Sequence, residues 1–409
     1  MWIAVRLVRS VRIVVLATAL ATIPHTLLAQ EQEPKPPAPP DEQAAPVGYQ
    51  LRDRIDRIRQ YFTDKGLVDL LLGDGFYLQF HGLTPGGGLR AGAGYRHTLS
   101  NQYWRYDVVG AVSVRGYRAF ESGLWWRPLA SGALEIGGHL HDRVFTREKF
   151  FGVGPASRRE DETSYRISAV QPFASMTARP PRWIVIGART GPREDHLGPG
   201  EDSNHPSIEQ RFSEDTVPGI GRQIRFLYSE VRAQVDLRDR PDHAPVGGAY
   251  AVTFERYADR DGGRFSTSRL IAEAAQDVPL AGPDHLLVLH VLAATTLADA
   301  GARVPFYLLP DAGGSDTLRA FDSWRFRDRN ALVLNAEYRY RAAPLLELAA
   351  FADYGAVGPE WRTISRSRMK PSYGVGVRGR TERRVILRFD VATGGGEGLH
   401  AMVTVGPAF

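Results

Sequence analysis

Apolar and polar residues alternate in one segment after another from Phe76 to Phe409, and this alternation limits the fold more than any other feature. Residues 228 to 238 show it well, with Val231, Val235 and Leu237 on one face and charged residues between them. A period of two is typical of β-strands whose two faces meet different surroundings. The body of the chain is therefore expected to be all-β.

Sixteen such segments can be placed along the sequence, and most are near the ~9–11 residues that cross a bilayer at a tilt. A soluble sandwich also alternates, but it seldom needs so many long strands. We therefore predict a sixteen-stranded antiparallel transmembrane β-barrel over residues 76–409, with its charges in the lumen. The expected strands are 76–83, 88–98, 102–116, 117–128, 131–146, 163–174, 181–191, 223–238, 247–259, 265–278, 284–298, 327–341, 345–356, 372–380, 384–393 and 399–409.

Aromatic residues fall near the ends of the expected strands, where barrels carry interfacial girdles. Phe409 ends an apolar face of the last strand, as suits recognition by barrel-assembly machinery, although a buried strand end would look the same. The connections 192–222 and 299–326 are long and are expected at the outer surface. The tryptophans assigned to the girdles are Trp104, Trp125, Trp126, Trp183, Trp324 and Trp361.

The N-terminal part divides into three expected segments. Residues 1–29 combine Arg6, Arg9 and Arg12 with an apolar stretch, the pattern of a secretory signal peptide; an uncleaved membrane anchor is the alternative. Residues 30–47 are rich in Pro, Glu and Ala and are expected to be a disordered linker. Within 48–75, apolar residues at helical spacing predict one short periplasmic amphipathic helix, either a solvated linker or a contact for the barrel mouth or a partner.

Composition narrows the function classes. The 51 basic and 46 acidic residues give a net charge of +5, which argues against a nucleic-acid binder held by bulk charge. The absence of cysteine excludes disulfides, thiolate metal sites and a cysteine nucleophile. His139 and His141 lie near Glu135, but alternation turns them into the lumen, where polar side chains are normal. No Ser/His/Asp set can be assembled from the spacing, and no Gly-x-Ser-x-Gly elbow of a lipase occurs. We therefore expect no enzyme, and no metal or cofactor.

The connection 299–326 contains Gly313-Gly314-Ser315-Asp316-Thr317-Leu318-Arg319-Ala320-Phe321. This passage resembles the BamA/TamA-type outer-membrane assembly family, also called bacterial surface antigen proteins. Members carry a Val-Arg-Gly-Phe/Tyr motif after a Gly-Gly-rich run, in a loop that folds back into the lumen. Leu318, Arg319, Ala320 and Phe321 match that motif, with Ala320 in place of the usual glycine.

The resemblance implies partners for the loop arginine. Members pair it with the carboxylate of a Phe-x-Asp-x-Gly motif on strand thirteen and with an acid on strand twelve. Phe351, Asp353 and Gly355 match the first, and Glu337 matches the second. A guanidinium forms bidentate hydrogen bonds with a carboxylate, so the pair is expected to lock the loop inside the barrel, or merely to stabilise the barrel.

Two further passages, 150–157 and 236–241, fit the family, so the resemblance covers residues 76–409. Residues 30–75 are too few for a polypeptide-transport-associated (POTRA) repeat, which makes the chain a short member. The resemblance implies a barrel in the bacterial outer membrane that contacts the lipid bilayer and assists insertion or translocation of proteins or lipids, with unfolded outer-membrane proteins as clients. A passive pore or structural surface barrel is the alternative. Gly82, Gly86 to Gly88 and Pro407 are expected to weaken the seam between the first and last strands.

Overall fold

A computed structural model describes residues 74–79, 87–88, 90–99, 102–128, 132–238, 246–282, 284–380 and 385–406. Residues 1–73, which hold the expected signal peptide, linker and helix, lie outside the described residues. The turn 239–241, Pro407 and Phe409 lie outside them too. Among the described residues, no helix is long and apolar enough to span a membrane.

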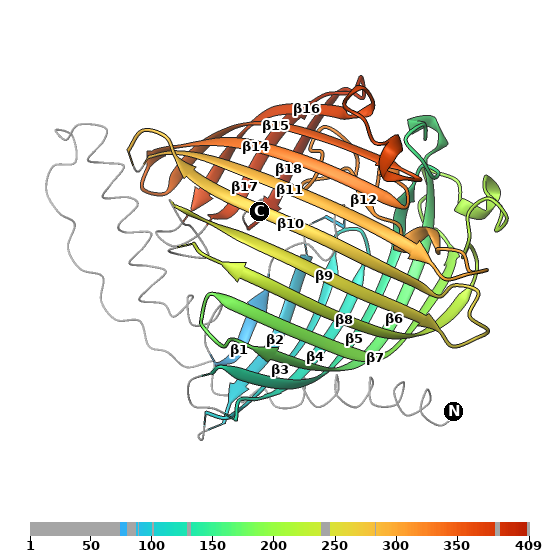
Figure 1. The fold of residues 1–409 in the computed structure, drawn as a ribbon, viewed down its shortest axis with the longest axis horizontal. Helices are drawn as coiled ribbons and strands as arrows, with labels where there is room; N and C mark the ends of the chain where they lie inside the picture. Colours follow the sequence, from blue (N-terminus) through green and yellow to red (C-terminus); the bar gives the residue numbers. More distant parts are fainter. Residues whose placement is uncertain are drawn as a thin grey trace, which may run out of the picture. The chain divides into compact units, whose positions relative to one another are not determined.

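Sixteen strands form one antiparallel sheet in which each strand pairs with its neighbour in sequence (Figure 1). This architecture confirms the predicted sixteen-stranded barrel. The strands are β1 (Gly75–Gln79), β2 (Arg90–Thr98), β3 (Trp104–Ser113), β4 (Arg118–Trp126), β5 (Leu134–Phe150), β6 (Thr163–Ala178), β7 (Ile184–Pro199), β8 (Gln223–Asp236), β9 (Gly247–Asp259), β10 (Thr267–Pro279), β11 (His285–Ala298), β14 (Asn330–Ala343), β15 (Leu346–Gly358), β16 (Lys370–Arg380), β17 (Val385–Thr393) and β18 (Leu399–Val405).

The first and last strands, β1 and β18, are the two edges of this sheet. Within the described residues no backbone pairing joins them, so the described part of the wall has an unpaired seam between β1 and β18. Both strands are short, with five residues in β1 and seven in β18, whereas β5 has seventeen.

Alternation along the strands separates an outer apolar face from an inner polar face. On β15, Leu346, Leu348 and Tyr354 are about 40% exposed, while Phe351 and Asp353 are buried. Large apolar residues recur on the outer face of the other strands too. The outside of the barrel is thus built for an apolar solvent and the inside for polar contacts.

Three residues depart from the expected faces. Trp125 turns inward and packs edge to face against His139, and Trp324 lies in the connection between β11 and β14, so neither belongs to a girdle. Val385 also breaks the alternation: it is buried although Leu387, two residues later, is exposed, because a register shift at Gly379/Arg380 skips one residue of β17. The other four tryptophans of the predicted girdles are all more than a third exposed.

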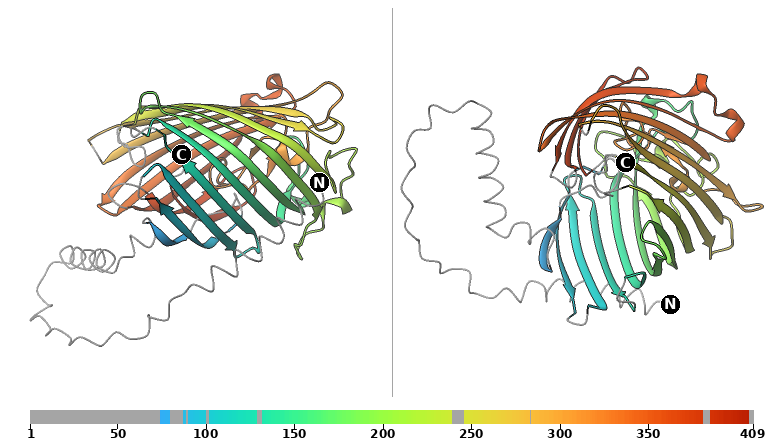
Figure 2. Two further views of the ribbon diagram at one scale, coloured as in Figure 1. Left: turned by 90° about the horizontal axis from the view of Figure 1, so that it is seen from below. Right: turned by 60° about the vertical axis from the view of Figure 1, so that its left-hand side comes forward.

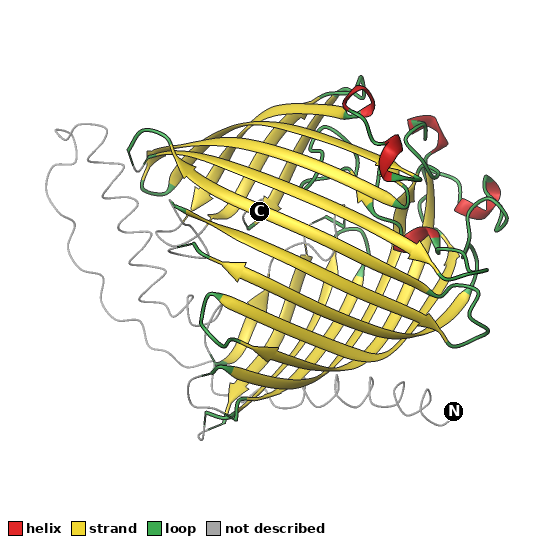
Figure 3. Ribbon diagram, in the orientation of Figure 1, coloured by secondary structure: helices red, strands yellow, loops and turns green. Residues whose placement is uncertain are grey.

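The connections differ in length at the two ends of the barrel. We call the end with short connections, such as the two residues between β14 and β15, the short-turn end, and the opposite end the long-loop end. The short 3-10 helices of the described residues all lie at the long-loop end (Figure 3). There a cluster of buried apolar side chains, including Phe150, Phe226 and Phe306, packs the loops together.

Residues 299–329, between β11 and β14, form what we call the lumenal loop. It contains a 3-10 turn at Phe306–Leu308 and a small hairpin of β12 (Asp311–Ala312) and β13 (Phe326–Arg327). Views from other sides show the strands curving around this loop (Figure 2). Its central residues make hydrogen bonds to the inner faces of β14, β15, β16 and β17.

Candidate functional site: the lumenal loop and its anchors

The Gly-Gly run creates the turn that aims the motif at the barrel wall. Gly313 and Gly314 have φ angles of 134° and 101°, a region that favours glycine. The Gly314 amide donates to the carbonyls of both Leu318 and Phe321, at 3.2 and 3.0 Å. A side chain on Gly313 would meet the Asp322 carbonyl at 2.3 Å. The compact turn therefore depends on both glycines.

Arg319 lies at the centre of the site and is fully buried. Its Nε and Nη2 donate to the two carboxylate oxygens of Asp353, at 3.1 and 2.7 Å, and its Nη1 donates to Glu337. The guanidinium also lies 3.4 Å from the centre of the Phe351 ring. The structure thus brings together Arg319, Glu337, Phe351 and Asp353 from a loop and two strands.

Two neutral side chains that the sequence did not indicate complete the coordination of Asp353. Asn335 on β14 donates to Asp353 Oδ1 at 2.8 Å and to the carbonyl of Thr317 at 2.7 Å. Ser372 on β16 donates to Asp353 Oδ2 at 3.1 Å and accepts the Ala320 amide at 2.9 Å. Both residues therefore tie the loop backbone to the same carboxylate.

Further charges surround the second acid. Glu337 accepts from Arg339 at 2.7 Å and from Arg378 at 3.0 Å, in addition to Arg319. Burial alone would lower the pKa of Arg319, but its hydrogen bonds to Asp353 and the charge of Glu337 raise that pKa above its usual value. The arginine is therefore permanently charged, and two carboxylates balance it.

A last charged contact reaches β17. Arg388, buried on the inner face, donates to Asp316 of the loop at 2.9 Å. The loop is thus bonded to four consecutive strands, β14 to β17.

Ala320 fits the motif without strain. Among the described residues, only Gln102 and Trp324 are non-glycine residues with positive φ, so the backbone at Ala320 is ordinary. Its methyl group is completely buried in an apolar cluster with Leu318 and Phe321. A glycine is therefore not needed at this position for backbone reasons.

Gly355 has a packing role. A side chain at this position would approach the side chain of Leu318 to 3.1–3.2 Å. The small residue therefore leaves room for the loop to lie against β15. All the described residues of the two predicted motifs meet in one place.

The segment 150–157 contacts the opposite side of the loop. The Gly154 amide donates to the Arg327 carbonyl at 2.7 Å, and Ser157 accepts from Arg325 at 3.0 Å. Lys149, at the end of β5, forms an ion pair with Asp322 at 2.9 Å. Burial would raise the pKa of Asp322, but the charge of Lys149 lowers it below its usual value.

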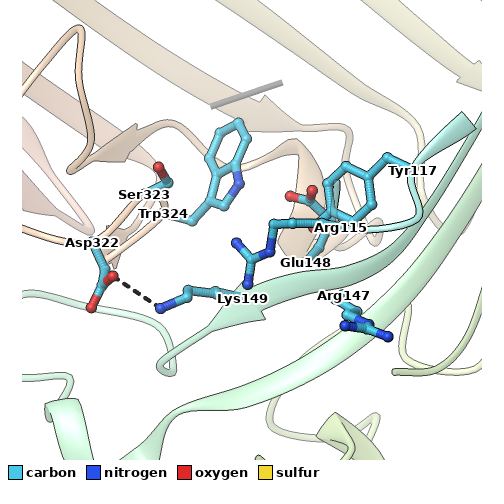
Figure 4. Close-up of a pocket in the computed structure, with 8 residues that line it drawn as sticks. All are labelled: Arg115, Tyr117, Arg147, Glu148, Lys149, Asp322, Ser323 and Trp324. Carbon is cyan, nitrogen blue, oxygen red and sulfur yellow. Dashed lines mark hydrogen bonds and ion pairs between the residues drawn. The ribbon is translucent and has the colours of Figure 1, made fainter. Parts of the chain in front are cut away.

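A cavity of about 140 Å³ lies beside this second attachment (Figure 4). Lys149 and Asp322 meet on one side of it, and Trp324 and Tyr117 lie on another. Its lining residues are Arg115, Tyr117, Arg147, Glu148, Lys149, Asp322, Ser323 and Trp324. The mixed charges of this lining show that the loop meets β5 through polar contacts.

The histidines near Glu135 make ordinary wall contacts. His139 pairs with Ser175 at 2.8 Å, and both His139 and His141 pack against Phe173. Over the described part of the chain, no group of three or more His, Cys, Asp or Glu residues is placed to hold a metal ion.

Solved structures share this architecture. The crystal structure of BamA from Haemophilus ducreyi lacking POTRA domains 1–3 matches with a TM-score of 0.62 at 13% identity, covering 81% of this chain and 70% of that one. CdiB from Escherichia coli matches with a TM-score of 0.52 at 10% identity, covering 81% of this chain and 62% of that one. No family model and no curated protein sequence matches. The chain therefore has the fold of a BamA-type barrel.

Proposed function

We propose that this barrel resides in the bacterial outer membrane and assists the insertion or translocation of other polypeptides. The observation that carries the proposal is the combination of an unpaired seam with a lumenal loop bonded to the strands on one side of that seam. The likeness in fold to BamA and CdiB supports it.

The seam offers a chemical means of handling a client. An edge strand exposes unpaired N–H and C=O groups, and an incoming strand pairs with them by β-augmentation. In the bilayer such groups have no water to satisfy them, so a client strand that pairs there gains full hydrogen bonds. As proposed, the barrel acts through backbone pairing rather than through a chemical step.

The bonds that Arg319 and its neighbours make between the lumenal loop and the barrel wall, which we call the loop lock, hold the wall rigid on one side of the seam. Arg319 holds the loop to β14 and β15, and Ser372 and Arg388 extend the attachment to β16 and β17. These are the four strands that precede β18 in the sheet, and β17 pairs with it directly. A fixed loop therefore keeps the wall beside the seam in one conformation while β18 remains available.

The test places the purified barrel in liposomes and measures how fast an unfolded outer-membrane protein inserts. We expect the wild-type barrel to accelerate insertion and Arg319→Ala to lose most of that acceleration. Arg362→Ala is the control, because Arg362 is an exposed loop arginine that pairs only locally with Glu360. An unchanged rate of client insertion in Arg319→Ala would show that the activity does not depend on the contacts of Arg319.

A passive pore is the alternative outcome of the same experiment. Any barrel of this size qualifies as a channel if its lumen is open. Ion conductance by the wild-type barrel without acceleration of client insertion would favour the pore and overturn the proposed function.

A further inference from the structure

The last hairpin, β17–β18, carries the seam edge, and its turn lies at the long-loop end. We call residues 394–398 the terminal turn. Among the described strands, β18 is hydrogen-bonded to β17 alone. What else holds this hairpin therefore decides how freely the seam edge can move.

Side chains tie the terminal turn to two other loops. Arg159, in the β5–β6 connection, donates through Nη1 to the Glu397 carbonyl at 2.8 Å. Arg325, in the lumenal loop, donates through Nε to Glu397 Oε1 at 2.8 Å. Arg325 also donates to the hydroxyl and the carbonyl of Ser157, each at 3.0 Å. We call Ser157, Arg159, Arg325 and Glu397 the clasp.

The central ion pair of the clasp is shielded from water. The side chains of Arg325 and Glu397 are 4% and 11% exposed. The Arg325 guanidinium lies 5.0 Å from the Phe151 ring centre and 4.5 Å from that of Phe326, within range of cation–π attraction. A charge pair in such surroundings is screened little by salt.

An apolar contact supports the same turn. A side chain on Gly395 would meet the ring of Phe321 at 2.3 Å, so the turn backbone lies directly on this motif residue. At the adjacent Gly396 a side chain would meet nothing within 4 Å. Both glycines have positive φ, 60° and 79°, which makes them a matched pair for substitution.

The clasp connects the two sides of the seam by a short route. Strands β1 to β6 lie on one side of the seam and β14 to β18 on the other. We propose that the clasp restrains the terminal turn and so sets the width of the seam at the long-loop end. The inference rests on the proposed function only for why the seam should open; the contacts of the clasp do not depend on any client.

The test measures the width of the seam at both ends by pulsed electron–electron spin resonance. Because the chain has no cysteine, two introduced cysteines carry the only spin labels. Leu78→Cys with Leu399→Cys reports the long-loop end, and Phe76→Cys with Val403→Cys reports the short-turn end. These four residues are exposed on β1 and β18.

Two clasp variants are expected to widen the seam. Glu397→Gln removes the charge that Arg325 binds, and Gly395→Ala forces the turn away from Phe321. In each, the Leu78–Leu399 distance should increase by roughly one strand spacing, ~5 Å, in a larger fraction of molecules, with a smaller change for Phe76–Val403. Arg159→Ala, at an exposed residue, gives a third variant with little risk to folding.

Matched controls separate the clasp from general damage. Gly396→Ala also places an alanine at positive φ, but without the clash, and Glu360→Gln removes an exposed loop carboxylate. Heat-modifiable migration on gels checks that each variant is folded. Unchanged distances in folded Glu397→Gln and Gly395→Ala, or equal widening in Gly396→Ala, would overturn the clasp.

The outcome is distinguishable from that of the proposed function. Widening without accelerated client insertion by any variant or wild type supports the clasp and removes the insertase. Insertion that depends on Arg319, together with unchanged distances, keeps the insertase and removes the clasp.

Discussion

The Arg319–Asp353 contact predicts strong thermodynamic coupling between two residues that lie 34 positions apart in sequence. Arg319→Ala removes the guanidinium but keeps the backbone amide, which itself donates to Asp353 at 3.2 Å. The Asp353 carboxylate then remains buried next to Glu337 with less positive charge around it. Asp353→Ala leaves the guanidinium with Glu337 and the Phe351 ring.

The expected loss of stability depends on which hydrogen bonds the remaining charged residue keeps in each variant. Breaking a buried pair by removing one partner costs ~3–5 kcal/mol. Asp353 keeps its bonds to Asn335 and Ser372, and Glu337 keeps Arg339 and Arg378, so we expect the lower end for each single variant, about 3 kcal/mol. The double variant leaves neither charge unpaired and should cost about 4 kcal/mol in all, a coupling of about 2 kcal/mol.

Urea unfolding of the barrel in phospholipid vesicles, followed by tryptophan fluorescence, measures the four free energies of unfolding in this cycle. The exposed pair Arg362 and Glu360 is the control, and its coupling should be below ~1 kcal/mol. Single effects of Arg319→Ala and Asp353→Ala that add to within ~0.5 kcal/mol would refute the reasoning, because contacting residues should not be additive.

Three further predictions concern the loop itself. Ala320→Gly should lower the free energy of unfolding by about 1 kcal/mol, because the backbone there needs no glycine; an increase would contradict this. Gly314→Ala should cost ~1–3 kcal/mol in the same assay, since its φ of 101° disfavours any side chain; a neutral result would contradict it. Burial raises the pKa of Asp311 to about 6 against the charge of Arg327. The folded state therefore favours the protonated acid, and this contribution to the free energy of unfolding is complete below pH ~4 and is lost as the pH rises through 6. Asp311→Asn should reduce that loss of stability with pH. Equal pH profiles of the free energy of unfolding in wild type and variant would contradict the prediction.

Alternation predicted the strands because the two faces of the wall meet different solvents. Alternation did not predict the strand ends that lie beyond the apolar outer face. β7 continues to Pro199, eight residues beyond the expected end at 191, and β5 continues to Phe150. These extensions lie at the long-loop end, where loops cover the wall and no apolar outer stripe is required. The sequence there loses its period although the backbone stays extended.

The motif residues were predictable, but their neutral supports were not. Arg319, Asp353 and Glu337 carry a recognisable pattern of charge and spacing, which the resemblance to a family made specific. Asn335 and Ser372 are ordinary polar residues on inner faces that hold many such residues. Only the registers that pair Asn335 with Asp353, and Asp353 with Ser372, bring all three together.

Charge and apolar packing hold the same loop segment in different ways. Leu318, Ala320 and Phe321 are buried in one apolar cluster, and burial of that kind is favourable but non-directional. A buried ion pair adds little net stability, yet the planar fork of Arg319 fits its two acids in one orientation only. That orientation fixes where the residues after Phe321 emerge, and these include Asp322 and Arg325, which reach β5 and the terminal turn. The Arg319 ion pairs therefore fix the position of the loop more than they stabilise the fold. That fixed position allows one loop to contact both sides of an unpaired seam.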